Sequence, residues 1–536
     1  KENVYAYVLE DGKLTEEQEK SSANDVYKFL KEGTGDSFTR MFDISDDYSY
    51  EDTLKIMSVR YALFYNYPKH IQITVASNVS DATVAAVMEN SANMPGVTIK
   101  QQTHRVYNES LYFAHIMGYT GLISAEELEE YNDENEYYNS TDVIGKSGIE
   151  NEFEEELSGV KGSEIVSTNV YGKVTGIVDQ TEPIAGNDVY LTIDSELQKS
   201  AYHILEKRIA GILIDKIQPD MNYGSKGDSA SNILTPIYEV YYGLINNNVI
   251  DINKLSKPDA GDTEKAVYKK YTNVLEDVFK KIDNFLSTAN TITNKNAGDM
   301  EDYLDYFYDV LKADGILLES NIPDDDDYYN SYKKGNIPLN DFLKYALSNN
   351  YINLAKLDVG LEYHTSEEVY QKLVDYAKDL LKDDPVFKKM IYRHLIFSYT
   401  LTGSEICLLL FEQNVLEYNK EHIDKIKTGS ISAYNFMMDK LKNLEITPAM
   451  LALEPCSGSI VITDVNNGEV LALVTYPSYD NNKLANKIDP AYYSKLINDN
   501  TKPFNNRPLT ERTPPGSTFK MATAVAALEE GVVTPN

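Results

Sequence analysis

The sequence lacks tryptophan and has only two cysteines and seven histidines in 536 residues. Basic residues are also scarce: 50 Lys and Arg stand against 84 Asp and Glu, which gives a net charge of -34. Nucleic acids and anionic membranes bind through Lys and Arg, so this charge argues against both as partners. No histidine or cysteine has metal-ligand spacing around it, and we therefore expect no structural metal and no cofactor.

The two cysteines, Cys407 and Cys456, lie in apolar or loop surroundings. Buried thiols are the preferred interpretation, and a disulfide between them stays open because sequence does not give its geometry. Long apolar runs are missing as well, since the densest, residues 406–411, is far too short to span a bilayer. The chain begins with Lys1 instead of Met. Together these features predict a soluble piece of a larger protein, cut at the front.

At this length the chain should contain three or four domains. Within the first hundred residues, 71–77 alternates apolar and polar residues like a half-buried strand, and Ser80 begins a sequence typical of a capped helix. Residues 93–99 then turn into another predicted strand. The order of strand, helix and strand predicts a small α+β unit.

The next hundred residues predict further strands and a helix. Residues 166–174 favour two strands around a turn, and 187–194 favours another strand. Asp194 or Ser195 then caps a helix predicted over 197–208.

Residues 212–452 are rich in Tyr and acidic residues, and their long helical periodicities predict a mostly helical region. The periodic stretches are 264–285, 301–311 and 366–381, the last continuing to 396. Asp324–Asp327 lacks the spaced ligands, central Gly and terminal Glu of a calcium loop, so a solvated turn is favoured. After this region, 458–480 contains two apolar strands joined by Asn-Asn-Gly, which predicts a hairpin.

Near the end of the chain, Pro514, Pro515 and Gly516 interrupt any preceding element, and an Ala- and Leu-rich stretch follows. Ser517 should therefore lie on the first turn of a helix. Lys520 would face the same way, within reach of the Ser517 hydroxyl. An adjacent base turns a serine hydroxyl into an effective nucleophile, and lysine can be that base when burial or a cationic neighbour lowers its pKa.

A bare Ser-x-x-Lys is a weak signal, because Ser331-Tyr-Lys-Lys334 is another copy in a polar stretch. The longer string Pro-Pro-Gly-Ser-Thr-Phe-Lys, with Asn506-Arg507 upstream and an apolar helix downstream, closely resembles the active-serine motif of penicillin-binding proteins. The resemblance implies that Ser517 is a catalytic nucleophile and Lys520 its general base.

Two earlier strings extend the resemblance. Residues 105–121 and 145–162 contain glycines that would otherwise be turn residues and a Glu-rich piece that would otherwise be a solvated helix. Both are similar to the pedestal, or dimerisation, domain of class B penicillin-binding proteins, and they occur in the family's order. Asn108 departs from the family, which usually carries proline there.

The family's second and third motifs, Ser-x-Asn and Lys-Thr-Gly, should follow the active serine, but the chain ends at Asn536 before either appears. Copies at Ser22-Ala-Asn24, Ser348-Asn-Asn350 and Lys427-Thr-Gly429 precede Ser517 and are interpreted as coincidences. A fragment without these motifs is expected to have no useful turnover.

The resemblance implies a multidomain α+β fold: a β-rich pedestal, the start of a transpeptidase α/β sandwich and a large, mostly α-helical insertion. The expected boundaries are 1–188 for the pedestal, 189–211 for the first transpeptidase helix, 212–452 for the insertion and 453–536 for the N-terminal part of the transpeptidase domain, which includes the active-serine motif.

The implied activity is that of a serine D,D-transpeptidase, which cross-links peptidoglycan stem peptides and is acylated by β-lactams. Its place would be the outer face of the bacterial cytoplasmic membrane, held by an anchor helix upstream of Lys1. Two alternatives stay open. One is a non-catalytic scaffold that docks proteins of the cell-wall machinery or a second copy of itself, and the other is a penicillin sensor or serine β-lactamase.

Overall fold

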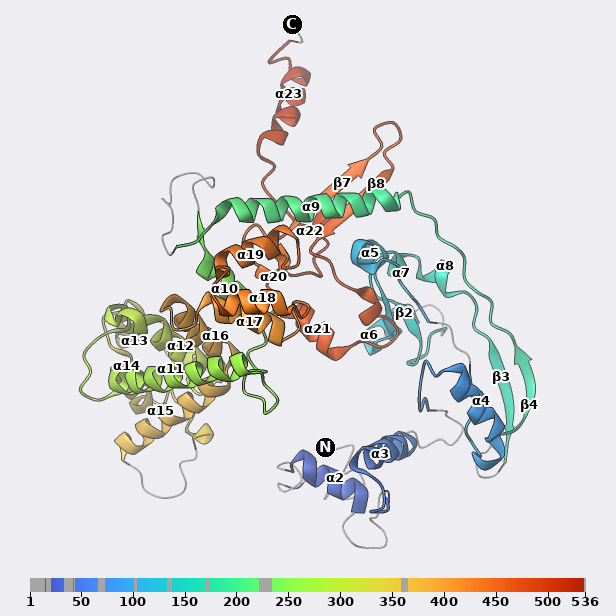
Figure 1. Cartoon of the computed structure of the whole chain (residues 1–536), viewed down its shortest axis with the longest axis horizontal. Helices are drawn as coiled ribbons and strands as arrows, with labels where there is room; N and C mark the ends of the chain where they lie inside the picture. The colour runs from blue at the N-terminus through green and yellow to red at the C-terminus, as the bar shows by residue number, and fades with distance from the viewer. Residues whose placement is uncertain are drawn as a thin grey trace. The chain divides into compact units, whose positions relative to one another are not determined.

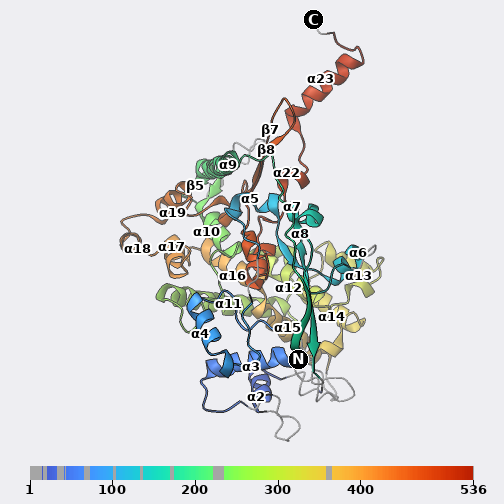
Figure 2. The same cartoon turned by 90° about the vertical axis from the view of Figure 1, so that its right-hand side faces the viewer.

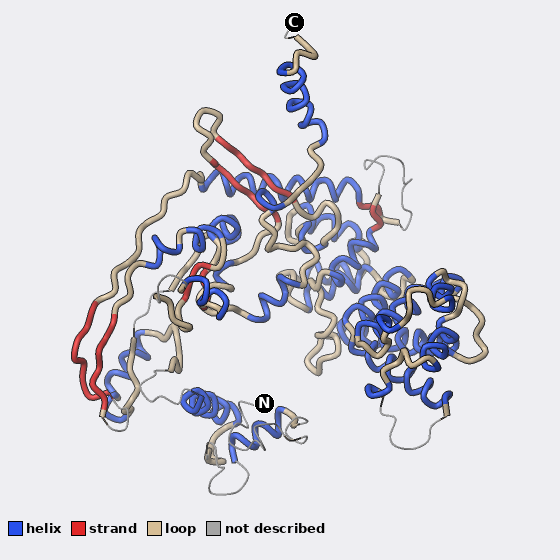
Figure 3. Tube along the Cα trace, turned by 180° about the vertical axis from the view of Figure 1, so that it is seen from behind, coloured by secondary structure: helices blue, strands red, loops and turns tan. Residues whose placement is uncertain are grey.

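The fold is that of a computed structural model, which describes most of the chain. The described residues are 15, 21–32, 42, 44–65, 73–100, 104–132, 137–169, 174–220, 234–357 and 365–534. They belong to two compact units, one of residues 1–104 with 153–189 and the other of residues 105–152 with 190–536. Helices dominate these residues and strands form short pairs (Figure 3), so the fold is multidomain α+β with few strands.

In the first unit, α2 (Ala23–Glu32) packs against α3 (Tyr50–Tyr65) over a small apolar cluster. The buried members of that cluster are Leu30, Phe42, Ile44 and Met57. α4 (Asp81–Glu89) follows, and the Ser80 side chain caps it by accepting a hydrogen bond from the Thr83 N–H at 3.3 Å. The helix predicted after Ser80 is confirmed.

The two strands predicted on either side of α4 are wrong wherever the structure describes them. Residues 73–77 and 94–99 form no strand, whereas Ile71 and Gln72 lie outside the described residues. Alternation of apolar and polar residues indicates which face a strand would bury, but a strand also needs a neighbour to pair with. Here Val75 is 65% exposed, so the apolar face meets no partner.

One antiparallel ribbon follows α8 (Glu154–Ser158) in this unit. β3 (Ser163–Thr168) pairs with β4 (Val174–Thr181), with Ser163 opposite Thr181. The two strands predicted over 166–174 are thus confirmed. The described part of the unit is nevertheless more helical than the predicted β-rich pedestal, because the strands expected near α4 find no partner there.

The second unit begins with a series of short elements. These are α5 (Ser110–Met117), β1 (Thr120–Leu122), α6 (Ala125–Tyr131), β2 (Val143–Gly145) and α7 (Gly148–Glu152). β1 and β2 pair antiparallel. Gly118 has a φ of +74°, and a Cβ there would lie 1.7 Å from the Ser147 carbonyl oxygen, so this turn requires glycine. The turn role expected for this glycine is confirmed.

α9 (Ser195–Lys216) packs along the hairpin of β7 (Gly458–Thr463) and β8 (Val470–Tyr476) (Figure 1). The Asp194 carboxylate caps α9 by accepting a hydrogen bond from the Leu197 N–H at 2.9 Å. The predicted helix and the predicted hairpin are both confirmed. The helix continues past the expected end at Arg208 to Lys216, because its C-terminal half packs into the helical region that follows.

Residues 187–194 lead into α9 and do not form the strand predicted for them. The Asp194 N–H donates to the Leu471 carbonyl at 2.9 Å, but residues 187–194 form no ladder with β8. β8 pairs with β7, and in place of a further strand it binds a side chain: the buried Gln198 amide accepts from the Leu473 N–H at 2.8 Å and donates to the Leu473 carbonyl at 2.9 Å. One side chain on α9 thus satisfies strand backbone that another strand would otherwise pair.

The predicted helical region is a body of packed helices built on one continuous apolar core. Its α-helices are α10 (Ile237–Asn246), α11 (Asp262–Leu286), α12 (Glu301–Ala313), α13 (Asp327–Lys333), α14 (Leu339–Ser348), α15 (Ser366–Asp383), α16 (Pro385–Phe397), α17 (Gly403–Glu412), α18 (Lys420–Lys427), α19 (Ala433–Lys442) and α20 (Pro448–Leu451). Figure 2 shows α10 beside α16 and α17, which it contacts. The periodicity predicted over 366–396 divides at Asp384, which caps α16 by accepting from the Phe387 N–H at 2.7 Å.

Two expectations from composition concern the cysteines and the apolar runs. Cys407 and Cys456 are buried free thiols, and burial raises the pKa of the first to about 12 and of the second to about 11. The interpretation as buried thiols is confirmed. Across the described ranges, no helix combines the length and apolarity that crossing a bilayer requires.

Candidate active site

The Pro-Pro-Gly sequence places Ser517 immediately before a helix. Gly516 has a φ of +56°, in the left-handed region that favours glycine, and it opens a single 3-10 turn, Gly516–Thr518. That turn runs directly into α23 (Phe519–Glu529), and the Thr518 hydroxyl donates to the Pro515 carbonyl at 2.5 Å. Ser517 therefore precedes the α-helix by one short turn, and Lys520 is the second residue of α23. The placement differs little from the prediction.

The side chains of Ser517 and Lys520 are both exposed. Within the described ranges, neither has a hydrogen bond or an ion pair. α23 buries none of its residues, and Phe519 and Met521 are 59% and 77% exposed. The structure thus has the expected nucleophile and base at the expected spacing, and no described residue covers them.

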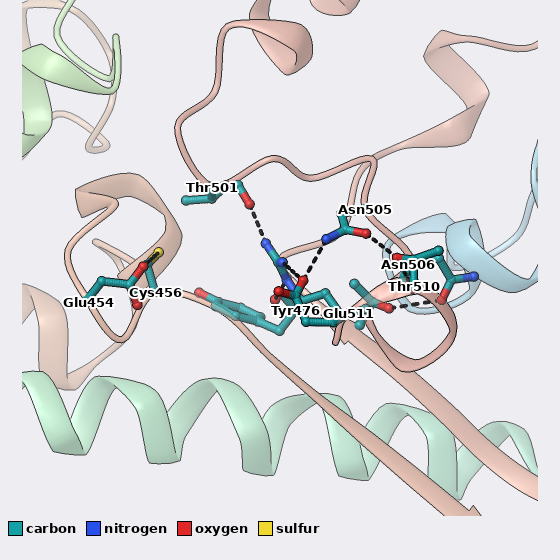
Figure 4. A network of polar contacts seen from close by, with 10 residues as sticks. Glu454, Cys456, Tyr476, Thr501, Asn505, Asn506, Thr510 and Glu511 are labelled. Atoms are coloured by element: carbon teal, nitrogen blue, oxygen red, sulfur yellow. Dashed lines mark hydrogen bonds and ion pairs between the residues drawn. The ribbon is translucent and has the colours of Figure 1, made fainter. Parts of the chain in front are cut away.

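Arg507, ten residues before Ser517, is by contrast tightly held at the start of α22 (Arg507–Thr510). Its side chain is 10% exposed. The Nε atom donates to the Tyr476 carbonyl at 3.2 Å, one terminal nitrogen donates to the Thr501 carbonyl, and the other lies 3.2 Å from a Glu511 carboxylate oxygen (Figure 4). The guanidinium therefore joins the end of β8 to two places in the segment that leads to Ser517.

The two asparagines before Arg507 extend this network (Figure 4). Asn506 donates to the His115 carbonyl at 3.1 Å and accepts from the Thr475 hydroxyl at 3.5 Å. Asn505 donates to the Glu511 carboxylate at 2.8 Å. Burial lowers the pKa of His115 to about 4, so its ring is neutral at pH 7. Residues 505–511 are consequently fixed to both β8 and α5.

Amide side chains also hold the segment around α5 against residues 481–486. Asn482 exchanges two hydrogen bonds with the Tyr107 backbone, at 2.8 and 2.9 Å. Asn486 does the same with the Arg105 backbone, at 3.0 and 2.9 Å. These hydrogen bonds join the string that begins at Arg105 to the segment that leads to the active-serine motif. Both segments lie in the second unit.

The copies of the second and third family motifs lie in ordinary helix-end positions. Lys427-Thr-Gly429 ends α18, where Thr428 is the C-cap and Gly429 has a φ of +70°. Ser348-Asn-Asn350 ends α14, and Ser22-Ala-Asn24 begins α2. None of the three copies lies on a strand. These placements agree with the interpretation as coincidences.

The acidic run 324–327 forms a helix start. Asp326 caps α13 by accepting from the Tyr329 N–H at 2.7 Å, and it also accepts from the Tyr345 hydroxyl at 2.6 Å. The interpretation as a turn is confirmed. Over the described ranges, no three His, Cys, Asp or Glu side chains are grouped to hold a metal ion.

Comparison with known families gives two matches, in the order that the strings suggest. Residues 1–191 match the penicillin-binding protein dimerisation domain, and residues 458–536 match the penicillin-binding protein transpeptidase domain. The chain belongs to the class B penicillin-binding proteins. Ser517, Lys520 and Arg507 lie in the transpeptidase match, whereas the helical body lies between the two matches.

Individual relatives match parts of the chain. The peptidoglycan D,D-transpeptidase MrdA of Escherichia coli (strain K12) is 33% identical over 144 residues, which cover 26% of this chain and 23% of the relative. MrdA of Haemophilus influenzae is 26% identical over 281 residues, or 47% of this chain and 43% of the relative. The peptidoglycan D,D-transpeptidase PbpA of Mycolicibacterium smegmatis is 45% identical over 80 residues, or 14% and 16%. The chain spans less than half the length of these curated relatives.

Sequence reasoning missed the residues that hold this region together. Asn506 and Arg507 were recognised as part of the string, but without a role. Asn482 and Asn486 had no local signal, since an asparagine that binds distant backbone looks like any loop asparagine. Gln198 was hidden within a helical pattern.

Proposed function

We propose that the whole protein to which this chain belongs is a serine D,D-transpeptidase that cross-links peptidoglycan, with Ser517 as nucleophile and Lys520 as general base. The observation that carries the proposal is their spacing, three residues apart at the start of α23, within the segment that matches the transpeptidase domain. The names of the relatives, all peptidoglycan D,D-transpeptidases, support the same reaction.

In the proposed first step, neutral Lys520 takes the hydroxyl proton of Ser517 as the oxygen attacks the D-alanyl carbonyl of a stem peptide. The peptide C–N bond then breaks, and the departing D-alanine amine takes the proton from Lys520. The Ser517 N–H, at the start of the helix, is one proposed donor to the oxyanion. A second stem-peptide amine attacks the acyl-enzyme, and its proton returns to Ser517. A β-lactam would acylate the same oxygen by opening its ring.

The proposed organisation keeps the predicted boundaries: a pedestal over 1–188, the first transpeptidase helix over 189–211, a helical insertion over 212–452 and the first part of the transpeptidase domain over 453–536. The helices of the body and its place between the two family matches support the insertion. Because the substrate lies outside the cytoplasmic membrane, we place the whole protein there, on a membrane anchor. Its proposed partners are stem peptides, β-lactams, and either cell-wall proteins or a second copy.

A fluorescent penicillin tests the nucleophile in the whole protein. We expect covalent labelling of the wild type, and loss of all labelling in Ser517→Ala, because the attacking oxygen is gone. Ser331→Ala is the matched control, since Ser331 begins another Ser-x-x-Lys sequence, on α13, and its loss should leave labelling unchanged. Equal labelling of Ser517→Ala and the wild type would overturn the proposal.

We further propose that this chain alone has no useful turnover. The exposed position of Ser517 and Lys520 supports this, because an acyl-transfer site excludes water around the reacting groups, and no described residue covers either side chain. Stable labelling of the isolated chain that disappears in Ser517→Ala would contradict this point and would leave the assignment of the nucleophile intact.

A further inference from the structure

The segment before Ser517 contains a firmly held part and a short connection. Residues 505–511 carry the network of Arg507 and its two asparagines, and their α22 turn is closed by the Glu511 N–H, which donates to the Arg507 carbonyl at 3.1 Å. From Arg512 to Thr518 every residue is exposed. The position of Ser517 therefore depends on where the held part ends and how stiff the connection is.

The connection has little freedom. Pro514 and Pro515 have fixed φ angles, and each proline also restricts the residue before it, which includes Thr513. Pro515 has φ and ψ of -67° and -16°, and the Thr518 hydroxyl closes the turn over it. A stiff connection transmits the position of its origin, so displacement of Glu511 would displace Ser517 as well.

The position of residues 505–511, where the connection begins, depends on Arg507 more than on any other side chain in the network. A guanidinium has donors in a fixed fork, so it can serve the Tyr476 and Thr501 carbonyls and the Glu511 carboxylate simultaneously. Both carbonyls belong to residues that are 1% and 2% exposed, where water does not easily replace a lost donor. The ammonium of a lysine cannot reach the same three acceptors from a single nitrogen.

We infer that Arg507 is a positioning residue for Ser517: its guanidinium fixes residues 505–511 to the end of β8, and this sets where the Pro-Pro-Gly turn delivers the nucleophile. The inference rests on the proposed function, because it concerns the rate at which Ser517 is acylated. Arg507 itself contacts no reacting atom.

The test measures acylation of the whole protein by a fluorescent penicillin as a function of its concentration. We expect Arg507→Ala to lower the limiting acylation rate by about 10- to 100-fold, the scale that a displacement of about 1 Å can cause. The concentration that gives half of the limiting rate should change little. A general loss of folded protein would instead reduce the amount of label and leave the rate constant of the remaining molecules unchanged.

Arg512→Ala is the matched control. Arg512 carries the same charge, lies nearer to Ser517 and is exposed, with no hydrogen bond or ion pair in the described structure. This variant should be acylated like the wild type. Added guanidinium should restore part of the rate in Arg507→Ala by occupying the vacated site.

Arg507→Lys keeps the test decisive if Arg507→Ala fails to fold. It preserves the charge and should fold, but it should still be acylated more slowly than the wild type. Wild-type rates in either folded variant would overturn the inference and leave the proposed function standing. Failure of Arg507→Lys to fold would assign Arg507 to stability alone and also overturn it. If the wild type itself is not acylated at Ser517, the proposed function fails and the inference falls with it.

Discussion

Two short apolar helices of this chain, α17 and α23, have different surroundings. α17 buries Ile406, Cys407, Leu409, Leu410 and Phe411 in the helical body. α23 has a similar length and is equally rich in apolar residues, yet it buries none. The comparison teaches that local sequence predicts a helix, whereas burial depends on residues from elsewhere in the chain.

α23 exposes large apolar side chains of the kind that a helix normally packs against other elements. Met521 and Val525 are 77% and 60% exposed, and Leu528 is 44% exposed. An isolated helix of fewer than about 12 residues is marginal in water, so α23 depends on packing that the described residues do not supply. Ser517 and Lys520 lie at the start of the same helix, and they too lack packing from the described residues.

The largest expected effect in the comparison comes from removing one phenylalanine from each region. Phe387, in α16, is fully buried and lies 5.7 Å from the Phe279 ring and 5.8 Å from the Tyr303 ring, between centroids. Phe387→Ala should lower the free energy of unfolding of the helical body by about 3–5 kcal/mol. Phe519→Ala, on exposed α23, should change it by less than about 0.5 kcal/mol.

Urea unfolding of the chain, followed by circular dichroism, measures both changes. Equal losses from the two substitutions would break the comparison, because they would show that Phe519 is packed in solution. An unchanged unfolding transition in Phe387→Ala would show that Phe387 does not pack in the apolar core of the helical body.

A smaller effect concerns pH, and it also belongs to the packed region. Burial by itself raises the pKa of Glu319, but hydrogen bonds from Lys312, Tyr308 and Tyr329 outweigh it and lower the pKa from 4.5 to about 2. The Lys333 ammonium lies 3.4 Å from the same carboxylate. Because the folded pKa is below the unfolded one, this stabilisation is complete above pH 4.5 and is lost as pH falls toward 2.

We expect Glu319 to contribute about 1–2 kcal/mol to the stability of the helical body at neutral pH, since its partners are partly exposed to water. Unfolding of the wild type and Glu319→Gln, measured across this pH range, checks the value. Glu319→Gln should be less stable at neutral pH, and the difference should shrink with acid. A difference in unfolding free energy that does not depend on pH would show that the charge of the Glu319 carboxylate does not stabilise the fold.

Much of this organisation was predictable from sequence wherever the signal was local. Ser80 and Asp194 cap helices as expected, and the hairpin of β7 and β8 forms around its Asn-Asn-Gly turn. Predictions failed where a distant partner decides the outcome. Residues 73–77 have the alternation of a strand, but no strand among the described residues pairs with them.

The candidate site shows the same division. The spacing of Ser517 and Lys520 follows from a proline-glycine turn and a helix, both of which are local features. The hold of Arg507 on Tyr476 and Thr501 does not, because these residues meet only after the chain has folded back on itself. No pattern of residue types around Arg507 indicates which carbonyls it will bind.

The most direct test of the central claim is to locate the adduct that a penicillin forms on the whole protein. Trypsin should release residues 513–520 as one peptide, between Arg512 and Lys520, and fragmentation in a mass spectrometer can separate Ser517 from Thr513 and Thr518. We predict the penicilloyl group on Ser517. An adduct on any other residue, or no adduct in a protein that is folded, would contradict the assignment of Ser517 as the nucleophile.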